Sequence, residues 1–482
     1  MCPPAGTAGG ERRHSRGLSD EGSPEGGTAV SGSVPTRDGF AGKFGVLAAT
    51  LGSAVGLGNI WKFPYITGEN GGASFLLAYL LATLLVGLPV AVFEIMLGRE
   101  GRANTIATMR RLSAPKGQSW WVLAGVGGLA SAVLIIGFYA DVMGWVFAYV
   151  PKALFGDLPT TDPEAARRVF TDTAGSAANS LLWQWGVLVL VGAVLARGVS
   201  KGIERLTKIL LPLLFVLLCL LAGRSLFLPG AGRALEFLFA PDFTKLTSAV
   251  MLTALGLAFF KLSVGMGIMM TYGSYFRADQ DIPLTVTRVV LCDLFISLLA
   301  GLAIFPAVFT YGFVPEEGPN LLFVTVPAVF AQMPGGRLLV PLFFCLACIA
   351  GLGALLSLVE VLVACLGEGL RLSRPKAAVL AVLLLGLVGV MPALSFGAAA
   401  EIKIWGRNFF ELYDHLSSNV LMPATAILIC LFSGWVFGRE RVLDCLTNRG
   451  TLGNDRTAQL LYLILRWVAP VLIGVIMWQG LR

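Results

Sequence analysis

The chain has 482 residues, of which 56% are hydrophobic and only 13% are charged. This apolar share exceeds that of water-soluble domains and excludes an ordinary cytosolic enzyme. The net charge of +7 does not indicate nucleic-acid binding, because the basic residues lie in short segments between apolar runs rather than in basic patches interleaved with aromatic residues.

Residues 1–38 are rich in Gly, Ser, Pro and Arg and lack an apolar core. We expect a disordered cytoplasmic tail there rather than a signal peptide. Apolar runs of the length of a membrane span follow, near residues 42–66, 73–98, 120–150, 179–196, 206–228, 246–276, 284–313, 338–370, 377–395, 418–437 and 458–480. The sequence therefore predicts an all-α polytopic membrane protein with eleven transmembrane helices.

Lysine and arginine are concentrated in the segments that a cytoplasmic N-terminus would place inside the cell. The positive-inside rule then predicts a multi-pass protein of the cell inner membrane with its N-terminus in the cytoplasm and its C-terminus outside.

Glycine clusters interrupt the first and the sixth apolar runs, at residues 52–58 and 263–267. Because five spans invert the direction of the chain, this matched pair indicates two inverted five-helix repeats, each with a broken first helix. The repeats would occupy residues 39–230 and 231–438, and residues 439–482 would form a cytoplasmic loop and the eleventh helix. The alternative is that these glycines only allow helices to pack closely.

A helix broken in the membrane is tolerable only beside a polar cavity, because lipid cannot satisfy the freed N–H and C=O groups. Half-helix N-termini suit a carboxylate, and freed carbonyls suit an ammonium group or a cation. A zwitterionic amino acid fits both.

The sequence at residues 52–64, GSAVGLGNIWKFP, and the sequence ENGG at residues 69–72 resemble the first-span signature of the neurotransmitter:sodium symporter family, whose bacterial prototype is the leucine transporter. The similarity extends over about residues 37–480 and includes TYGSY at 271–275 and LAIFP at 302–306. The resemblance implies the leucine-transporter fold, broken first and sixth helices and secondary transport by alternating access.

The resemblance also implies a substrate site. By position it comprises Ala54, Gly56, Leu57, Gly58, Ile135, Tyr139, Phe260, Lys261, Ser263 and Met266, with the Tyr139 hydroxyl on the substrate carboxylate. Monoamine transporters of the family have an aspartate where this chain has Gly56, so the glycine favours a substrate with its own carboxylate. The glycines at 265 and 267 leave room for large apolar or aromatic side chains.

The resemblance also implies an outer and an inner gate, and this chain has residues at the positions of both ion pairs. Lys62 and Asp414 match the outer ion pair, and Arg37 and Glu368 match the inner pair, with Tyr275 beside it.

The sodium sites of the family are altered. Ala54 and Asn59 fit the first site, but Lys261 replaces a hydroxyl donor, and Asp293 takes the position of another donor. Because a helix rises about 1.5 Å per residue, Lys261 stands roughly 20 Å from either end of its run and cannot reach the headgroups. It therefore requires a partner, and Asp293 has a compatible depth.

In the second site, Gly353 and Ala354 replace two hydroxyl residues. We hypothesise that Lys261 acts as a built-in cation, so that transport is sodium-independent or linked to protons. The alternatives are a conventional sodium-coupled symporter with a static ion pair and, from another class, an amino-acid sensor that does not transport.

The sequence contains no Walker loop and no catalytic histidine set, so an enzyme is not expected. We expect an amino-acid substrate and a lipid bilayer as partners, with no nucleic acid, no metal cofactor and no sodium requirement. Chloride dependence and the choice between monomer and dimer are open.

Overall fold

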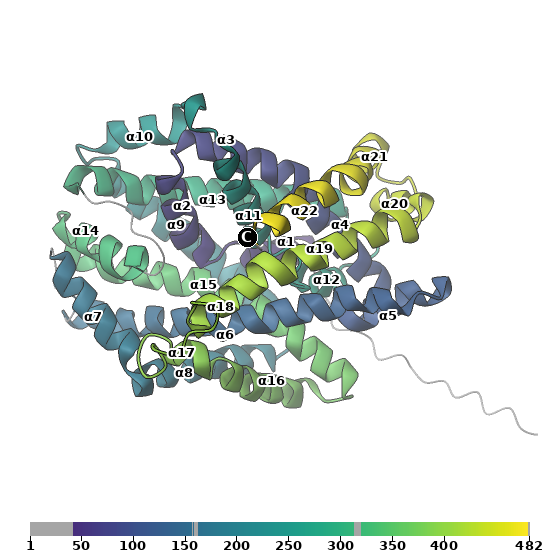
Figure 1. The fold of residues 1–482 in the computed structure, drawn as a ribbon, viewed down its shortest axis with the longest axis horizontal. Coiled ribbons are helices and arrows are strands. Elements are labelled where there is room, and N and C mark those ends of the chain that lie inside the picture. Colours follow the sequence, from purple (N-terminus) through teal and green to yellow (C-terminus); the bar gives the residue numbers. More distant parts are fainter. Residues whose placement is uncertain (1–41, 157, 159–161, 313–319, 481–482) are drawn as a thin grey trace, which may run out of the picture. The chain divides into compact units, whose positions relative to one another are not determined.

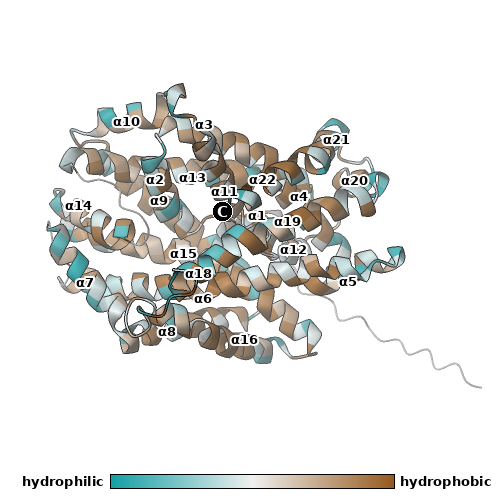
Figure 2. Ribbon diagram, in the orientation of Figure 1, coloured by the Kyte–Doolittle hydropathy of each residue, from teal (hydrophilic) through white to brown (hydrophobic). Residues whose placement is uncertain are grey.

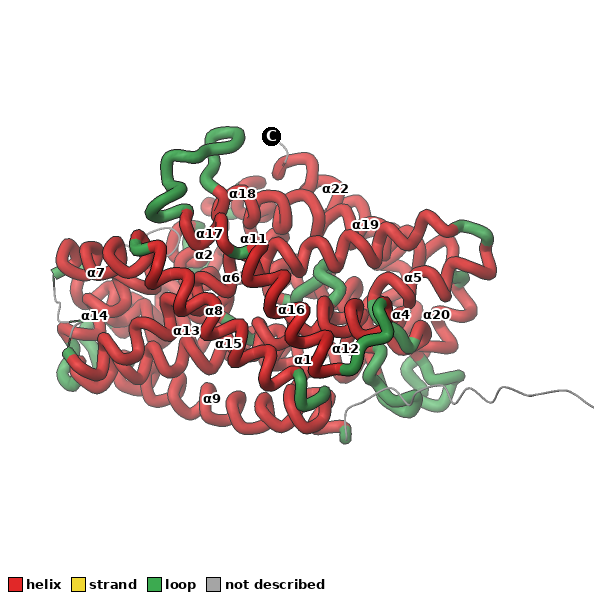
Figure 3. The backbone as a smooth tube through the Cα atoms, turned by 90° about the horizontal axis from the view of Figure 1, so that it is seen from below, coloured by secondary structure: helices red, strands yellow, loops and turns green. Residues whose placement is uncertain are grey.

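A computed structural model describes residues 42–156, 158, 162–312 and 320–480 of the chain. The chain divides into two units, Met1–Thr36 and Arg37–Arg482, and all described residues belong to the second. These residues form helices and no named strand, as Figure 3 shows. The division into two repeats and a C-terminal helix stays a prediction.

The helices of the first half are α1 (Lys43–Ala54), α2 (Phe63–Glu69), α3 (Ala73–Ala82), α4 (Leu88–Gly101), α5 (Thr105–Ser113), α6 (Val122–Phe155), α7 (Pro163–Gly175), α8 (Ala177–Leu195) and α9 (Arg205–Ser225). Those that follow, to residue 394, are α10 (Ala231–Phe239), α11 (Ser248–Lys261), α12 (Ile268–Gly273), α13 (Ile282–Tyr311), α14 (Val326–Gln332), α15 (Gly336–Gly369), α16 (Arg374–Val388) and α17 (Val390–Leu394). The last are α18 (Phe409–His415), α19 (Met422–Leu431), α20 (Arg439–Leu446), α21 (Asp455–Leu463) and α22 (Ala469–Gly480).

Within the described residues, nine continuous helical segments are long and apolar enough to cross a membrane. A tenth span is bent by 51° between Phe44–Ala54 and Gly58–Glu69. The predicted sixth span consists of α11 and α12, which Leu262–Gly267 separate. Both predicted breaks are therefore present, whereas the number eleven and the inverted relation of the two halves stay predictions.

The long helices carry apolar side chains on their outer surfaces. Leu182 and Val471 are more than half exposed although both lie in candidate spans. Figure 2 shows that brown, hydrophobic residues dominate the long helices and that hydrophilic residues gather on short helices such as α7 and α20. Exposed apolar surface on this scale fits a lipid environment, so the chain is a multi-pass membrane protein.

The break in the sixth span depends on unusual backbone conformations. Ser263, Gly265 and Gly267 all have positive φ angles, of 53°, 77° and 71°. A Cβ atom added to Gly265 would also lie 2.4 Å from the Met422 carbonyl oxygen. Glycine is therefore required at position 265 by both backbone conformation and space. The freed Gly265 N–H donates to Oε1 of Glu94 on α4, 2.7 Å away.

The two longest helices, α6 and α15, have 34 residues each and pack against each other. In Figure 1 the broken segments α1, α11 and α12 lie in the central part of the helical unit. Because α15 also packs against α1 and α12, the two breaks face the middle of the long helices, and this places the candidate site.

Candidate functional site

A cavity of about 390 Å³ lies between the two breaks. It is lined by Ser53, Ala54, Gly56, Gly58, Ile135, Tyr139, Phe260, Lys261, Ser263, Met266, Ala354 and Leu358. The structure thus brings together all the predicted substrate residues except Leu57. The Leu57 N–H group donates to the Tyr139 hydroxyl at 3.3 Å, so this residue adjoins the cavity through its backbone.

One hydrogen bond connects the two breaks, and another lies within the first break. The Ser263 hydroxyl donates to the Ser53 carbonyl oxygen at 3.3 Å, and the Gly56 N–H donates to Oδ1 of Asn59 at 3.2 Å. The polar groups freed by unwinding therefore have local partners or face the cavity, as the membrane interior requires.

Lys261 is the last residue of α11 and forms an ion pair with Asp293 on α13. Its Nζ atom lies 2.9 Å from Oδ2 of Asp293, and both side chains have 0% exposure. The ammonium group also donates to the Ser297 hydroxyl. The rings of Phe63 and Tyr79 flank it, with centres 4.7 and 5.3 Å from Nζ. The charge is thus paired, hydrogen-bonded and in contact with aromatic faces, and these contacts offset the cost of burying it.

Asp293 is held from several sides. Asn59 Nδ2 donates to Asp293 Oδ1 at 2.7 Å, and the Tyr79 hydroxyl donates to Oδ2 at 3.4 Å. The Ser297 hydroxyl donates to the Asp293 carbonyl oxygen at 2.7 Å. Since side chains from α3, α11 and the segment Gly58–Lys62 meet at this carboxylate, the network fixes the position of the lysine beside the cavity.

The residues present do not fit a sodium ion at the first site. A positively charged amine occupies the predicted position, and Oδ1 of Asn59, which we expected to be an ion ligand, accepts from Gly56. A cation there would meet the like charge of the Lys261 amine.

The second site is also poorly suited to an ion. A Cβ atom at Gly353 would lie 2.6 Å from the Gly52 carbonyl oxygen, because α15 approaches α1 closely at this point. Ala354 lines the cavity with a methyl group. No side-chain oxygen is supplied by either position.

At the predicted outer gate, the structure brings Lys62 and Asp414 together. Lys62 Nζ lies 3.9 Å from Oδ1 of Asp414 and 4.1 Å from the centre of the Phe260 ring. The Ser418 hydroxyl donates to the same carboxylate oxygen at 2.8 Å. Lys62 thus lies directly over a residue that lines the cavity.

The predicted ion pair of the inner gate stays a prediction. Arg37 lies outside the described residues. Oε2 of Glu368 accepts from both the backbone N–H and Nδ2 of Asn104, at 2.8 and 3.0 Å. Tyr275, which we expected beside Glu368, donates its hydroxyl proton to Oε1 of Glu360 at 2.5 Å.

Glu360 has a second strong partner, because Arg374 Nη2 donates to its Oε2 at 2.7 Å. This ion pair connects α15 to the start of α16. Arg374 and Tyr275 thus each hold one oxygen of the Glu360 carboxylate, which is fully buried.

Sequence reasoning missed several residues of the site. Ser53 and Leu358 line the cavity, and the Phe63 ring faces the Lys261 amine. Leu358 follows Ala354 by four residues on α15, and Phe63 follows Asn59 by four residues in the helical segment after the first break. Because residues four apart share a helix face, this spacing could have identified both.

Two interrupted helices that meet at a buried polar cavity define a membrane transporter of the broken-helix class. The chain belongs to the Sodium:neurotransmitter symporter family, whose sequence profile matches residues 37–180 and 172–481. Members of such a family are transporters rather than enzymes.

Individual relatives are similar to this protein over almost the whole chain. The chain is 40% identical to the "Uncharacterized sodium-dependent transporter YhdH" of Bacillus subtilis, over 91% of this chain and 96% of that protein. It is 31% identical to an "Uncharacterized sodium-dependent transporter" of Haemophilus influenzae, over 92% and 98%. The crystal structure of MhsT in complex with L-phenylalanine superposes with a TM-score of 0.84 at 37% identity, covering 92% of this chain and 100% of MhsT.

Proposed function

We propose that this protein transports amino acids with large apolar or aromatic side chains by alternating access. The substrate carboxylate would bind the N–H groups of Leu57 and Gly58 and the Tyr139 hydroxyl, which already meets the Leu57 N–H group. The apolar side chain would lie against Ile135, Phe260 and Met266, which line the cavity. The L-phenylalanine bound to MhsT supports this substrate class.

The second part of the proposal concerns ion coupling. Lys261 supplies a fixed positive charge in place of the first sodium ion, so transport does not require sodium. The observation that carries this proposal is the fully buried ion pair of 2.9 Å between Lys261 and Asp293, next to the substrate cavity. The poor fit of Gly353 and Ala354 to an ion supports it.

Two modes of transport agree with a fixed cation. In the first, the pair stays charged and the protein is a uniporter or an exchanger. In the second, closure of the site displaces a proton from Lys261, and a proton moves with or against the substrate. The alternative of a conventional sodium-coupled symporter is favoured by the names of the relatives from Bacillus subtilis and Haemophilus influenzae.

The proposal also includes the membrane orientation and the two gates. We place the protein in the cell inner membrane with its N-terminus in the cytoplasm, so that Lys62 and Asp414 form the outer gate. Arg37 and Glu368 would contribute to the inner gate, with Tyr275 acting through Glu360.

Uptake of radiolabelled L-phenylalanine into proteoliposomes tests the proposal. We expect equal uptake when external sodium is replaced by choline. A proton ionophore distinguishes the two modes, because it lowers accumulation only when protons are coupled. Uptake that strictly follows an inward sodium gradient would overturn sodium independence and leave a conventional symporter.

Variants test the role of the lysine. Lys261→Thr is expected to lose uptake in choline, whereas Lys245→Thr should retain it, since Lys245 belongs to an exposed pair with Asp242. Unchanged uptake by Lys261→Thr in choline would refute the role of the lysine. A wild-type protein that binds L-phenylalanine but shows no counterflow would be a sensor instead.

A further inference from the structure

A second cleft, of about 1300 Å³, shares no lining residue with the substrate cavity. Its walls are the end of α4, the segment before α13, and α20 with the loop that follows it. Its lining residues include Ala278, Cys445 and Asn448. Figure 1 shows α20 at the same end of the helical unit as α5, with α7 and α14 at the other end.

Charged side chains dominate this cleft. Four arginines and two acids line it: Arg99, Arg102, Arg441, Arg449, Glu100 and Asp444. Burial raises the pKa of the Cys445 thiol to about 12, so this group adds no negative charge. The cleft therefore has an excess of two positive charges.

Two of the arginines are available for a ligand. Arg441 and Arg449 are exposed, and no ion pair within the described ranges involves either of them. The Arg441 guanidinium lies 5.2 Å from the centre of the Phe437 ring. Unpaired guanidinium groups in one cleft repel each other unless an anion lies between them.

Hydrogen bonds from one buried arginine hold the walls of the cleft together. Arg99, which is only 6% exposed, donates to the Gln280 carbonyl oxygen and to Oδ1 of Asn448, both at 3.0 Å. It also donates to the Cys445 carbonyl oxygen. One buried guanidinium thus ties α4 to the segment before α13 and to the end of α20.

The backbone at the rim is strained. Arg102, Asn448 and Arg449 have φ angles of 46°, 48° and 58°, in the left-handed region that favours glycine. Such conformations persist only where the surrounding structure enforces them, and they concentrate at functional sites. Here they direct two arginines to the same opening.

We propose that this cleft binds the phosphate group of an anion. The guanidinium group matches phosphate geometry and remains charged at all physiological pH values. The positive-inside rule assigns this end of the helices to the cytoplasm, where both anionic phospholipid headgroups and free phosphates occur.

A bound phosphate would connect Arg441 and Arg449 to the end of α4. Since α4 also carries Glu94, whose Oε1 accepts from the Gly265 N–H in the broken helix, the ligand would stabilise the arrangement of α4 seen here. The inference is independent of the proposed substrate and of sodium.

The experiment measures binding of short-chain phosphatidylglycerol and phosphatidylcholine to the purified full-length protein in a mild detergent, by native mass spectrometry. We expect at least tenfold tighter binding of phosphatidylglycerol. The double variant Arg441→Gln/Arg449→Gln should lose this difference, because the counter-charges of the phosphate are removed. Circular dichroism and gel filtration verify that the variant is folded.

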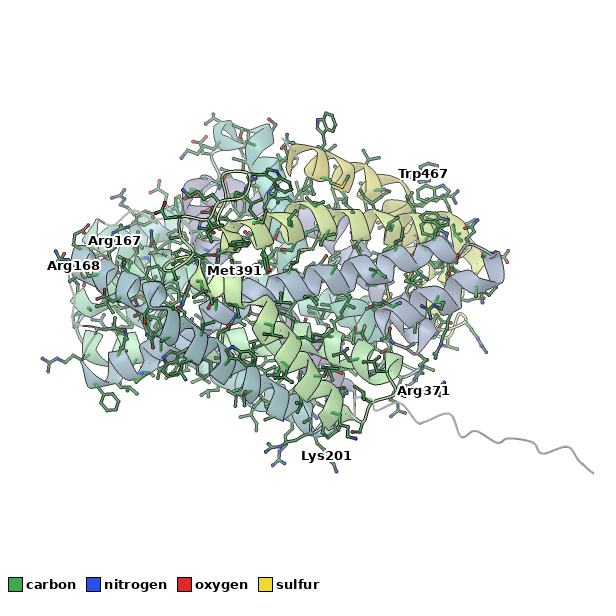
Figure 4. The ribbon with its side chains drawn as sticks, turned by 60° about the horizontal axis from the view of Figure 1, so that its bottom comes forward. Arg167, Arg168, Lys201, Arg371, Met391 and Trp467 are labelled. Atoms are coloured by element: carbon green, nitrogen blue, oxygen red, sulfur yellow. The ribbon has the colours of Figure 1, made fainter. Side chains whose placement is uncertain are left out.

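The matched control removes two other exposed cations of the same membrane side, Lys201 and Arg371, which Figure 4 labels. Lys201→Gln/Arg371→Gln should bind phosphatidylglycerol within twofold of the wild type. Asp444→Asn should bind it more tightly, a gain that misfolding cannot produce. Equal binding by the cleft variant and the control would overturn the proposal.

Competition with inorganic phosphate shows whether the cleft binds free phosphate or only the lipid headgroup. If millimolar phosphate displaces phosphatidylglycerol from the wild type, the cleft accepts free phosphate as well as the lipid. If it does not, the lipid headgroup is the ligand. Failure of the wild type to prefer phosphatidylglycerol, together with no effect of phosphate on its thermal stability, would also refute the site.

Discussion

The Nζ atom of Lys261 and the Oδ2 atom of Asp293 lie 2.9 Å apart, and neither side chain is exposed. The two residues come from different helices, the first ending at a break and the second lying in the middle of α13. In this pair the two opposite charges balance, and the amine stays beside the cavity. Both the proposed ion independence and the stability of the broken helices depend on this contact.

The losses of stability from removing the two partners should not add up. Asp293→Asn leaves a buried ammonium group without its counter-charge, which should lower stability by about 3–5 kcal/mol. Lys261→Met leaves the carboxylate in the same condition. The double variant Lys261→Met/Asp293→Asn should be destabilised by clearly less than the sum, as measured by thermal unfolding in detergent.

The exposed pair of Lys245 and Asp242, 3.9 Å apart, serves as the control for this cycle. The same substitutions there should change the unfolding temperature very little, because solvent screens the pair. Additive losses at Lys261 and Asp293 would show that the two groups are not coupled.

Two equally buried aspartates should respond in opposite directions to the same substitution. Asp141 on α6 has 0% exposure, and neither carboxyl oxygen has a hydrogen-bond partner among the described residues. Asp141→Leu should therefore raise stability, by about 1–3 kcal/mol. Asp293→Leu should lower it, because Lys261 then loses its partner. Thermal unfolding of the two variants side by side tests this, and a loss of stability in Asp141→Leu would indicate an essential polar role.

Hydropathy predicted the helical spans well. The runs near 73–98 and 338–370 correspond to helices Ala73–Gly101 and Gly336–Gly369, because a membrane span must be apolar over its whole length. The glycine clusters also located both breaks. In the sixth span, however, the helix already ends at Lys261, before the first glycine of the cluster.

The sequence did not predict which side chains of different helices contact each other. Glu360 and Glu368 stand eight residues apart on α15, roughly 12 Å along the axis, and the sequence does not fix the height at which α12 meets this helix. The structure shows Tyr275 at Glu360. Contacts between distant segments, such as Arg99 with Asn448, likewise required the packed structure.

Lys62 should make a modest contribution to substrate binding. Its amine lies over the Phe260 ring at the cavity and pairs with Asp414. The Lys62 side chain is 22% exposed and the Asp414 side chain is 39% exposed. A partly exposed cation–π contact and ion pair contribute about 1 kcal/mol together. Lys62→Gln should therefore weaken L-phenylalanine binding by about fivefold, as measured by isothermal titration calorimetry.

Lys62→Arg should retain most of this affinity, and Lys403→Gln, which alters an exposed lysine, should retain all of it. A loss of a hundredfold in Lys62→Gln would mean that the lysine contacts the substrate directly instead of closing the cavity.

Two glycines of the same helix provide the last test. A Cβ atom at Gly353 would lie 2.6 Å from the Gly52 carbonyl oxygen, whereas one at Gly369 would meet nothing within 4 Å. Gly353→Ala should lower stability by about 1–3 kcal/mol, because α15 must move away from α1 to make room. Gly369→Ala should be neutral or slightly stabilising, since alanine favours helix over glycine. Equal unfolding temperatures for the two variants in detergent would show that α15 can shift at no cost, and that the second ion position is not closed by this contact.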